Sequence, residues 1–288
     1  MMESAAGDLR HHNPSDVRRR ILVLEEERQP SLAQRVFGVN GFLVRALYLT
    51  SPALILVAWE ILAWAGAVDV RLFSAPSLIL KALVPVVTSG ELWVNTLVSL
   101  QRVLLGFLVG SGAGVLLGLA MGLAPPVRAA LGPMVAATFP IPKLAIMPLI
   151  LLVFGLGEAS KIVTVAVGVF YLVLINSMAG VMNIDKIYLD VARSFGASRK
   201  DFYLTVALPG ALPMIFAGLK LGMGTALLLI VAAELSAARA GVGYMIWRAY
   251  DMFDIERMFV GLMTMSLMGY ILSNFLDAVE RVVVPWKN

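Results

Sequence analysis

The sequence predicts an all-α membrane protein with six transmembrane helices. Of its 288 residues, 59% are hydrophobic and 15% are charged, and the mean hydropathy is +0.85. Soluble domains contain about 25% charged residues, so the composition disfavours a soluble enzyme, a disordered chain and a nucleic-acid binder. The chain has no cysteine, which excludes disulfides, thiol catalysis and cysteine-ligated zinc. Its two histidines are adjacent near the N-terminus, so no metal site is predicted.

Six windows are long and apolar enough to cross a bilayer, which requires about 20 residues of helix. Three carry no charge and span 103–127, 162–184 and 258–276; three carry one interior charge and span 47–68, 129–157 and 211–233. Lys220 and Arg102 stand near span ends, so we expect both side chains to reach the lipid headgroups. Glu60 and Lys143 lie deeper, where a charge normally faces protein or a water-filled cavity.

The basic residues predict a multi-pass protein of the bacterial cytoplasmic (inner) membrane with both termini in the cytoplasm. Fourteen of the 23 Lys and Arg residues fall in segments that this orientation places inside, and six fall outside. Residues 1–45 read as a cytoplasmic N-terminal extension, and 46–288 as the transmembrane domain. The longest apolar run in the extension is 21–24, too short for a signal peptide.

A row of glycines marks one face of the second span. It consists of Gly106, Gly110, Gly114, Gly118 and Gly122. Residues four apart lie above one another on a helix, so this face forms a groove without side chains. The groove favours close helix packing, and a second interpretation is that it lets helices slide during transport. Gly218 and Gly222 repeat the spacing once in the fifth span.

Prolines break the third span. Pro140 and Pro142 precede Lys143, and Pro148 follows. Proline removes a backbone donor, and the freed carbonyls at membrane depth require protein or a water-lined cavity nearby. The break therefore indicates either a segment that lines a solute path or a structural kink.

The polar segment 185–209 between the fourth and fifth spans has its own helical pattern. The spacing that predicts a short amphipathic helix is that of Ile187, Val191, Ser194 and Phe195. Gly196 is placed to end this helix, Asp201 to cap the next turn, and Pro209 to begin the fifth span. Such a rigid knob is suited to a groove on a partner protein.

This segment resembles a known family. The residues Asp190, Val191 and Ala192, then Gly196, then Val206 to Pro209 match the E-A-A-x₃-G-x₉-I-x-L-P loop of ABC transporter permeases, the inner-membrane subunits of binding-protein-dependent importers. The spacing agrees at every position. The departures are Asp for Glu at 190, Val for Ala at 191 and Val for Ile at 206. Asp190 is shorter than the family's Glu, so any contact of the longer side chain is in question.

The resemblance extends over about 90–288. Segments 140–145, 148–149, 154–158 and 234–244 are similar to the branch that imports nitrate, sulfonates, taurine and related small molecules. It implies a six-helix importer permease with a cytoplasmic coupling-helix loop. It also implies that this chain is a non-catalytic subunit of a transport ATPase complex, moving a small, anionic solute across the inner membrane.

In this family the loop docks onto a separate cytoplasmic ATPase. By resemblance the coupling residues are Asp190, Ala192, Arg193, Gly196, Leu208 and Pro209. Arg193 could meet acidic groups of the ATPase or belong to a positive cytoplasmic face. The chain lacks a G-x₄-G-K-[ST] loop, so ATP is used by the partner and no cofactor is expected here.

The other expected partners are an extracytoplasmic solute-binding protein, membrane lipid and a second copy of the chain; no nucleic acid is expected. Six helices leave little interior, so we expect a C₂ homodimer with the path at the interface. The candidate path residues are Lys143, Asn176, Ser177 and Thr225. Asn176 and Ser177 could equally be hydrogen-bond partners between helices. Lys143, if it faces the path, favours an anion.

Two further hypotheses concern the outer side and the class of transporter. Glu234 could contact the binding protein or pair with Arg239, and 239–257 reads as a docking surface or a solvated loop. The alternative function is a self-contained secondary transporter or channel, which requires intramembrane acids. Glu60 is the acid that qualifies. A membrane enzyme is disfavoured because the sequence offers no nucleophile and base set.

Overall fold

The computed structural model describes residues 41–287, and these residues form helices joined by short turns. The chain divides into two units, 1–65 and 66–288. In the first unit, α3 runs over Gly41–Trp64. The indole Nε1 of Trp64 donates a hydrogen bond to Glu60 Oε1 at 2.8 Å, so the charge predicted at depth has a partner one turn away. Most of the predicted N-terminal extension lies outside the described residues.

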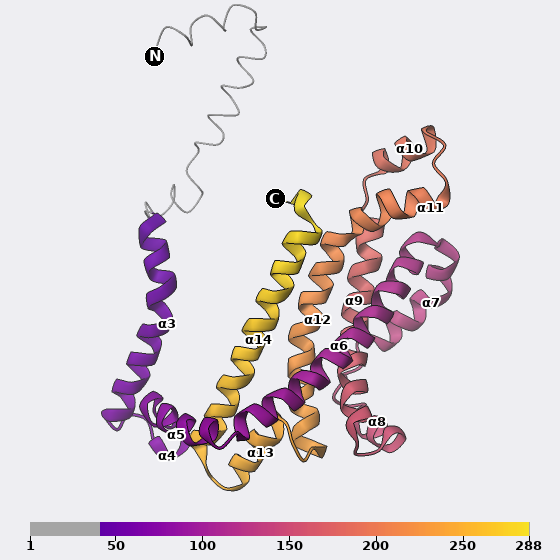
Figure 1. Ribbon diagram of the computed structural model, residues 1–288. Helices are drawn as coiled ribbons and strands as arrows, with labels where there is room; N and C mark the ends of the chain where they lie inside the picture. Colours follow the sequence, from indigo (N-terminus) through magenta and orange to yellow (C-terminus); the bar gives the residue numbers. More distant parts are fainter. Residues whose placement is uncertain (1–40, 288) are drawn as a thin grey trace, which may run out of the picture. The chain divides into compact units, whose positions relative to one another are not determined.

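The second unit contains the other helices, and its chain path can be followed in Figure 1. In order these are α4 (Val70–Phe73), α5 (Pro76–Thr88), α6 (Glu91–Leu123), α7 (Pro125–Thr138), α8 (Met147–Phe154), α9 (Glu158–Met182), α10 (Lys186–Ser194), α11 (Arg199–Phe202), the π-helix η2 (Tyr203–Ala207), α12 (Leu208–Ala237), α13 (Val242–Asp251), α14 (Ile255–Val283) and the 3₁₀ turn η3 (Pro285–Lys287).

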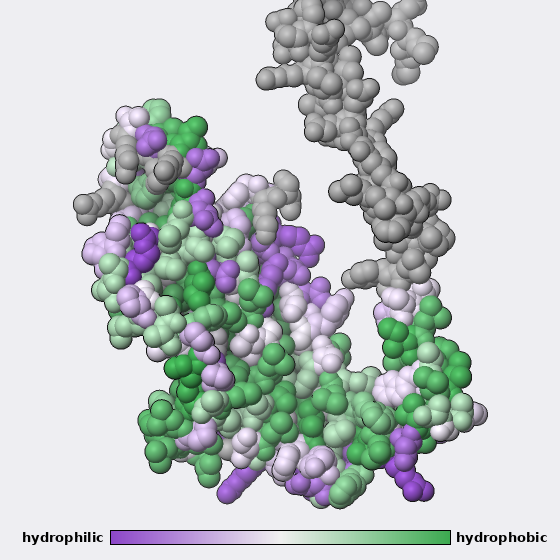
Figure 2. All heavy atoms as spheres, turned by 180° about the vertical axis from the view of Figure 1, so that it is seen from behind, coloured by the Kyte–Doolittle hydropathy of each residue, from purple (hydrophilic) through white to green (hydrophobic). Residues whose placement is uncertain are grey.

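Within the described part of the chain, four helices are long and apolar enough to cross a membrane. They occupy Glu91–Leu123, Glu158–Met182, Tyr203–Ser236 and Ile255–Val283. The other two predicted windows coincide with α3 and with the pair α7 and α8. In Figure 2, hydrophobic side chains cover much of the visible face of the second unit, and hydrophilic ones gather toward α10 and α11.

The predicted break in the third span separates α7 from α8. Helix α7 ends at Thr138, directly before the segment that contains Pro140 and Pro142, and α8 begins at Met147 with Pro148 in its first turn. The prolines cannot donate the backbone hydrogen bonds that a continuous helix needs, so the chain turns here instead of running straight.

The glycine row of α6 lies against α9. A Cβ atom on Gly106 would stand 2.7 Å from the Cβ of Val165, and one on Gly118 would stand 2.7 Å from the Cβ of Ser177. Real Cβ atoms do not approach so closely. The backbones of α6 and α9 can therefore lie this near to each other only because these positions of α6 are glycines. This contact is what brings α6 and α9 together over most of their lengths.

Helix α12 packs on another face of α9, again through a close backbone approach at a glycine. A Cβ atom on Gly218 would lie 2.7 Å from the Cβ of Asn176. The apolar core then fills the space between α6, α9, α12 and α14, and its fully buried members include Val103, Val165, Val169, Val173, Ala226 and Ile230. Helix α9 is therefore the central helix of the second unit.

Lys220 ties α12 to α14. Its ammonium group forms ion pairs with Asp277 and Glu280, one turn apart on α14. The prediction that Lys220 reaches the lipid headgroups did not include this pairing, because the two carboxylates lie on a neighbouring helix about 60 residues away in sequence.

The glycine contact generates a test with a control on the same helix. Gly118→Ala forces α6 away from α9, and overpacking of this kind costs about 1–3 kcal/mol. Gly112→Ala places its methyl group where no atom lies within 4 Å, so we expect no loss. Thermal unfolding of both purified variants in one detergent measures the difference. An equal loss of Tm for the two variants would contradict this packing.

Candidate functional site

The polar segment 185–209 folds as a helical hairpin of α10 and α11, here called the α10–α11 hairpin. Asp185 Oδ1 accepts a hydrogen bond from the amide of Ile187 at 3.0 Å, which starts α10. After α10, Gly196 adopts φ +65°, and the amide of Ala197 donates to the carbonyl of Ala192 at 3.0 Å. A left-handed residue at this position closes a helix, and glycine adopts it without steric cost.

The second helix of the hairpin is capped by a residue that the sequence reading passed over. Ser198 precedes α11, and its Oγ accepts from the amide of Asp201 at 3.2 Å while donating to Asp201 Oδ2 at 2.5 Å. The prediction that Asp201 is the cap is therefore wrong. Asp201 lies inside the first turn, where its carboxylate completes a reciprocal capping pair with the serine.

Apolar side chains stand exposed on the α10–α11 hairpin. Phe195 is 86% exposed, and Ile187, Tyr188 and Val191 are also exposed. Asp190 lies among them on an exposed position of α10. The other described residues leave these side chains without apolar cover. An exposed apolar patch of this kind is typical of a protein interaction site.

The remaining coupling residues fall into two groups. Ala192 is half-buried on α10, and Leu208 and Pro209 are half-buried at the start of α12. The side chain of Arg193 lies outside what the structure describes. The hairpin is joined to α12 through the π-helix η2 without an intervening loop.

The predicted path residues on α9 and α12 do not converge in one chain. Asn176 Nδ2 donates to the carbonyl of Leu172 at 2.8 Å, and Thr225 Oγ1 donates to that of Leu221 at 3.0 Å. Ser177 is fully buried, and its hydroxyl has no hydrogen-bond partner among the described residues. Asn176 packs toward α12 and Ser177 toward α6, so they occupy different helix interfaces.

Lys143 closes the break between α7 and α8. Its Nζ donates to the carbonyls of Thr138, Phe139 and Ile141 at 3.1, 2.9 and 3.0 Å. It also lies 4.1 Å from the centre of the Tyr171 ring. The carbonyls freed by the prolines thus find a cation from the same segment. All three N–H donors of Lys143 are engaged by the main chain here.

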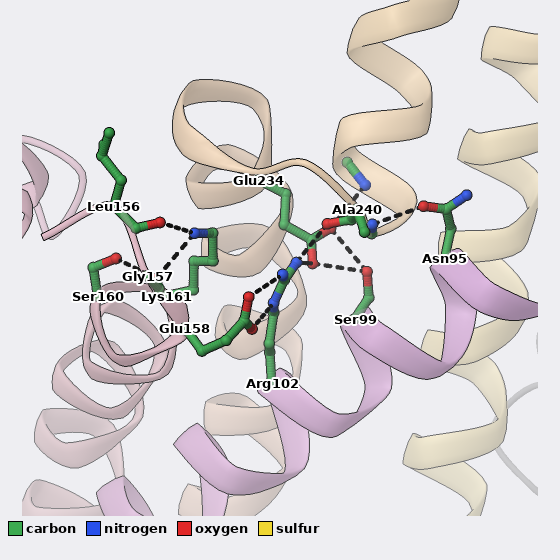
Figure 3. Close-up of polar contacts among 12 residues, drawn as sticks. Asn95, Ser99, Arg102, Leu156, Gly157, Glu158, Ser160, Lys161, Glu234 and Ala240 are labelled. Carbon is green, nitrogen blue, oxygen red and sulfur yellow. Dashed lines mark hydrogen bonds and ion pairs between the residues drawn. The ribbon is translucent and has the colours of Figure 1, made fainter.

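A group of hydrogen-bonded polar side chains gathers on α6, α9 and α12, and we call it the Arg102 cluster. Its members are Ser99, Arg102, Glu158 and Glu234 (Figure 3). Arg102 is 3% exposed and Glu234 is 1% exposed. The guanidinium binds Glu158 through two hydrogen bonds, of 2.5 Å from Nε and 2.6 Å from Nη2, and Glu234 through one of 2.7 Å from Nη1.

Glu234 is held by more than Arg102. The Ser99 hydroxyl lies 2.8 Å from each of its oxygens, and the amide of Gly243 donates to Oε2 at 2.9 Å. A Cβ atom on Gly243 would lie 2.7 Å from the Cβ of Glu234, so a larger residue would push the carboxylate away. The buried charge is therefore met by a cation, a hydroxyl and a backbone amide, as a buried carboxylate requires.

The loop between α12 and α13 is fastened to the same cluster. Arg102 Nη1 donates to the carbonyl of Ala240 at 2.7 Å, and the amide of Gly241 donates to Asn95 Oδ1 at 2.8 Å. The amide of Val242 donates to Ser99 Oγ at 2.8 Å. Side chains of α6 thus hold three consecutive residues of a loop about 140 residues further along the chain.

The Arg102 cluster corrects two predictions. Arg102 does not extend toward the headgroups, and Glu234 pairs with Arg102 instead of Arg239. The sequence carried a partial signal, because Glu158 and Glu234 both lie at the ends of predicted spans. The partners are 56 and 132 residues from Arg102, a separation that helical periodicity does not report. Among the described residues, no group of three or more His, Asp or Glu side chains is placed to hold a metal ion.

The comparisons with known proteins decide the family. The model of the binding-protein-dependent transport system inner membrane component matches residues 110–285. The chain belongs to this family. The chain is thus a non-catalytic permease subunit of an ABC importer and a multi-pass membrane protein. The ATPase activity of the importer lies in a partner subunit. The family also implies a solute-binding protein as a partner.

Curated relatives confirm the predicted branch of the permease family. The permease is 33% identical over 240 residues to the aliphatic sulfonates transport permease protein SsuC of Bacillus subtilis, covering 83% of this chain and 87% of that one. It is 33% identical over 245 residues to the taurine transport system permease protein TauC of Escherichia coli, with 83% and 89% covered. The nitrate import permease protein NrtB of Synechococcus elongatus is 33% identical over 201 residues, with 69% and 72% covered.

A solved structure supports the fold. A chain of the methionine ABC transporter MetNI in an inward-facing conformation superposes with a TM-score of 0.50 at 20% identity, covering 68% of this permease and 95% of that chain. At this identity the likeness shows the fold alone. The permease therefore shares the helical architecture of an ABC importer.

The Arg102 cluster generates a stability prediction. Arg102→Met leaves Glu234 buried without its cation, and breaking a buried pair in this way costs about 3–5 kcal/mol. Glu158→Gln should cost less than about 1 kcal/mol because the Glu158 side chain is 62% exposed. The double variant Arg102→Met/Glu234→Gln should recover part of the first loss. Thermal unfolding in one detergent compares the three; equal losses for Arg102→Met and Glu158→Gln would contradict this account.

Proposed function

We propose that this permease moves a small solute with a sulfonate or similar oxoanion group across the bacterial inner membrane, driven by ATP hydrolysis in its partner. The observation that carries the proposal is the set of relatives named for aliphatic sulfonates, taurine and nitrate, each 33% identical to this chain. Their agreement on small oxoanions is more informative than any single name.

We propose six membrane crossings with both termini in the cytoplasm. Helix α3 and the broken pair α7 and α8 would supply the two crossings beyond the four long apolar helices. The excess of Lys and Arg in the segments assigned to the inside supports this orientation. The permease itself would hold no cofactor, and ATP would bind to the partner subunit.

The α10–α11 hairpin is proposed as the coupling element. Its exposed apolar face around Phe195, with Asp190 beside it, suits a groove on the cytoplasmic ATPase. Closure of the ATPase dimer would push on the hairpin, and η2 would pass the movement to α12. The turn at Gly196 keeps α10 and α11 at a fixed angle, so the hairpin moves as a unit.

A second copy of the permease is proposed to complete the solute path. Asn176 lies between α9 and α12 and Ser177 between α9 and α6, so a path lined by both requires more surface than one chain supplies. A C₂ pair would place matching faces opposite one another. Membrane lipid would cover the apolar faces that remain outside the dimer.

The solute class is tested through the cognate solute-binding protein of this permease. We expect taurine, an alkanesulfonate or nitrate to raise the Tm of the purified binding protein, because a ligand that binds the folded state stabilises it. A neutral sugar and a neutral amino acid amide serve as controls. A Tm shift with the controls and none with the oxoanions would contradict the proposed solute class.

The coupling role is tested at the hairpin turn. Gly196→Val places a β-branched residue at φ +65°, and we expect the solute-dependent ATP hydrolysis of the reconstituted complex to fall at least tenfold. Gly196→Asn is the matched control, because asparagine tolerates left-handed φ, and it should retain most of the activity. Full ATPase stimulation with Gly196→Val, or uptake without any ATPase, would contradict the proposal.

A further inference from the structure

We propose that a basic hollow at one end of the second unit receives acidic side chains of the extracytoplasmic solute-binding protein. This hollow, here called the arginine pocket, has a volume of about 440 Å³. Arg239, Arg248 and Arg257 line it, and Asn95 and Ala240 form part of its lining beside the Arg102 cluster. The inference rests on the proposed importer function and names the surface where one of its partners docks.

The charge of the arginine pocket is unbalanced. Arg239 and Arg248 are exposed, and their side chains form no hydrogen bond or ion pair with a described residue. Arg257 is partly neutralised by Asp254, at 3.2 Å from its Nε. Among the described lining residues, Glu91 is the acidic one. Guanidinium groups bind carboxylates through paired hydrogen bonds, so free guanidiniums around a hollow select a carboxylate.

The position of the pocket identifies which partner reaches it. Helix α13, which carries Arg248, lies at the end of the second unit opposite to the α10–α11 hairpin (Figure 1). The hairpin is the proposed contact of the cytoplasmic ATPase. The arginine pocket therefore opens on the other side of the membrane, where the solute-binding protein arrives.

Aromatic side chains near the pocket favour a protein partner. The rings of Trp247 and Tyr250 lie 5.4 Å apart, and both side chains are exposed. Phe253 is 85% exposed at φ +56°, a conformation that is strained for a bulky residue. The turn is fixed by the amide of Asp254, which donates to the carbonyl of Ala249 at 2.9 Å. Exposed Trp and Tyr beside Arg is the composition of interface hot spots.

The same aromatic residues would suit a lipid interface, but the arginines argue for a protein. Lipid headgroups are met by basic residues spread along a membrane surface, whereas these three come from α13, α14 and the preceding loop and converge on one concave site. A concave site of this size accommodates a protruding loop with its acidic side chain.

The pocket is also joined to the helices that would respond to docking. Asn95 in its lining accepts from the amide of Gly241, and the carbonyl of Ala240 accepts from Arg102. A carboxylate bound to Arg239 would sit next to the loop that these two hydrogen bonds hold. Docking is thereby placed within one residue of the contacts that tie α6 to α12.

The test measures binding of the purified cognate solute-binding protein to the permease–ATPase complex in nanodiscs of neutral lipid. We expect the double variant Arg239→Glu/Arg248→Glu to weaken this binding at least tenfold, and the wild-type Kd to rise with NaCl concentration. Arg71→Glu is the matched control, because Arg71 is an exposed arginine outside the pocket, and its Kd should stay at the wild-type value. Unchanged thermal unfolding of the double variant excludes a folding defect.

A reciprocal variant sharpens the test. Among Asp→Arg and Glu→Arg variants of the binding protein, at least one should bind the double variant of the permease more tightly than the wild-type binding protein does. An unchanged Kd for the double variant overturns the arginine pocket while leaving the importer function intact. The binding assay is also repeated in nanodiscs that contain anionic lipid. If the double variant loses binding only in those nanodiscs, the pocket is assigned to lipid headgroups and the proposal is also overturned. If the wild-type complex shows no stimulation of ATP hydrolysis by the binding protein, the proposed function itself fails.

Discussion

The buried pair of Arg102 and Glu234 is the constraint on which the arrangement of the second unit depends. A carboxylate that is 1% exposed inside an apolar bundle is stable only where a cation and hydrogen-bond donors surround it. Arg102 supplies the cation from α6, Glu158 of α9 balances it, and Ser99 completes the shell. One end of α12 is therefore fixed to α6 and α9, and the loop that begins α13 is fixed with it.

Close backbone packing and buried charge act together along the same helices. The glycine row lets α6 lie directly against α9, and Gly218 does the same for α12. At that distance Arg102 reaches both Glu158 and Glu234, and the pair with Glu234 is fully buried. Toward the other end of α12, Lys220 is paired with Asp277 and Glu280 of α14. Helix α12 is thus anchored by ion pairs near its middle and near its C-terminal end, with apolar packing between them.

These anchors explain how events on the two sides of a membrane could be linked through one helix. The proposed ATPase contact leads through η2 into the start of α12, and the proposed docking surface lies beside the Arg102 cluster at its far end. A helix held at two points moves as a body, because its packed interfaces have discrete arrangements and resist gradual deformation. The break at Pro140 and Pro142, closed by Lys143, lies instead against α9, where Lys143 contacts the Tyr171 ring.

Local patterns in the sequence determined the helical class, the four long apolar helices, the proline break and the glycine turn at 196, because each depends on residues within about two helical turns. They also identified the family, through the spacing of a short loop. The tertiary structure alone decided the partners of Arg102, Glu234 and Lys220. The cap that Ser198 forms on α11 is a local contact with Asp201, three residues away. Helical periodicity predicts the face of a helix on which a side chain lies. The packing of the helices decides which distant charge it meets, as with Arg102 and Glu234, 132 residues apart.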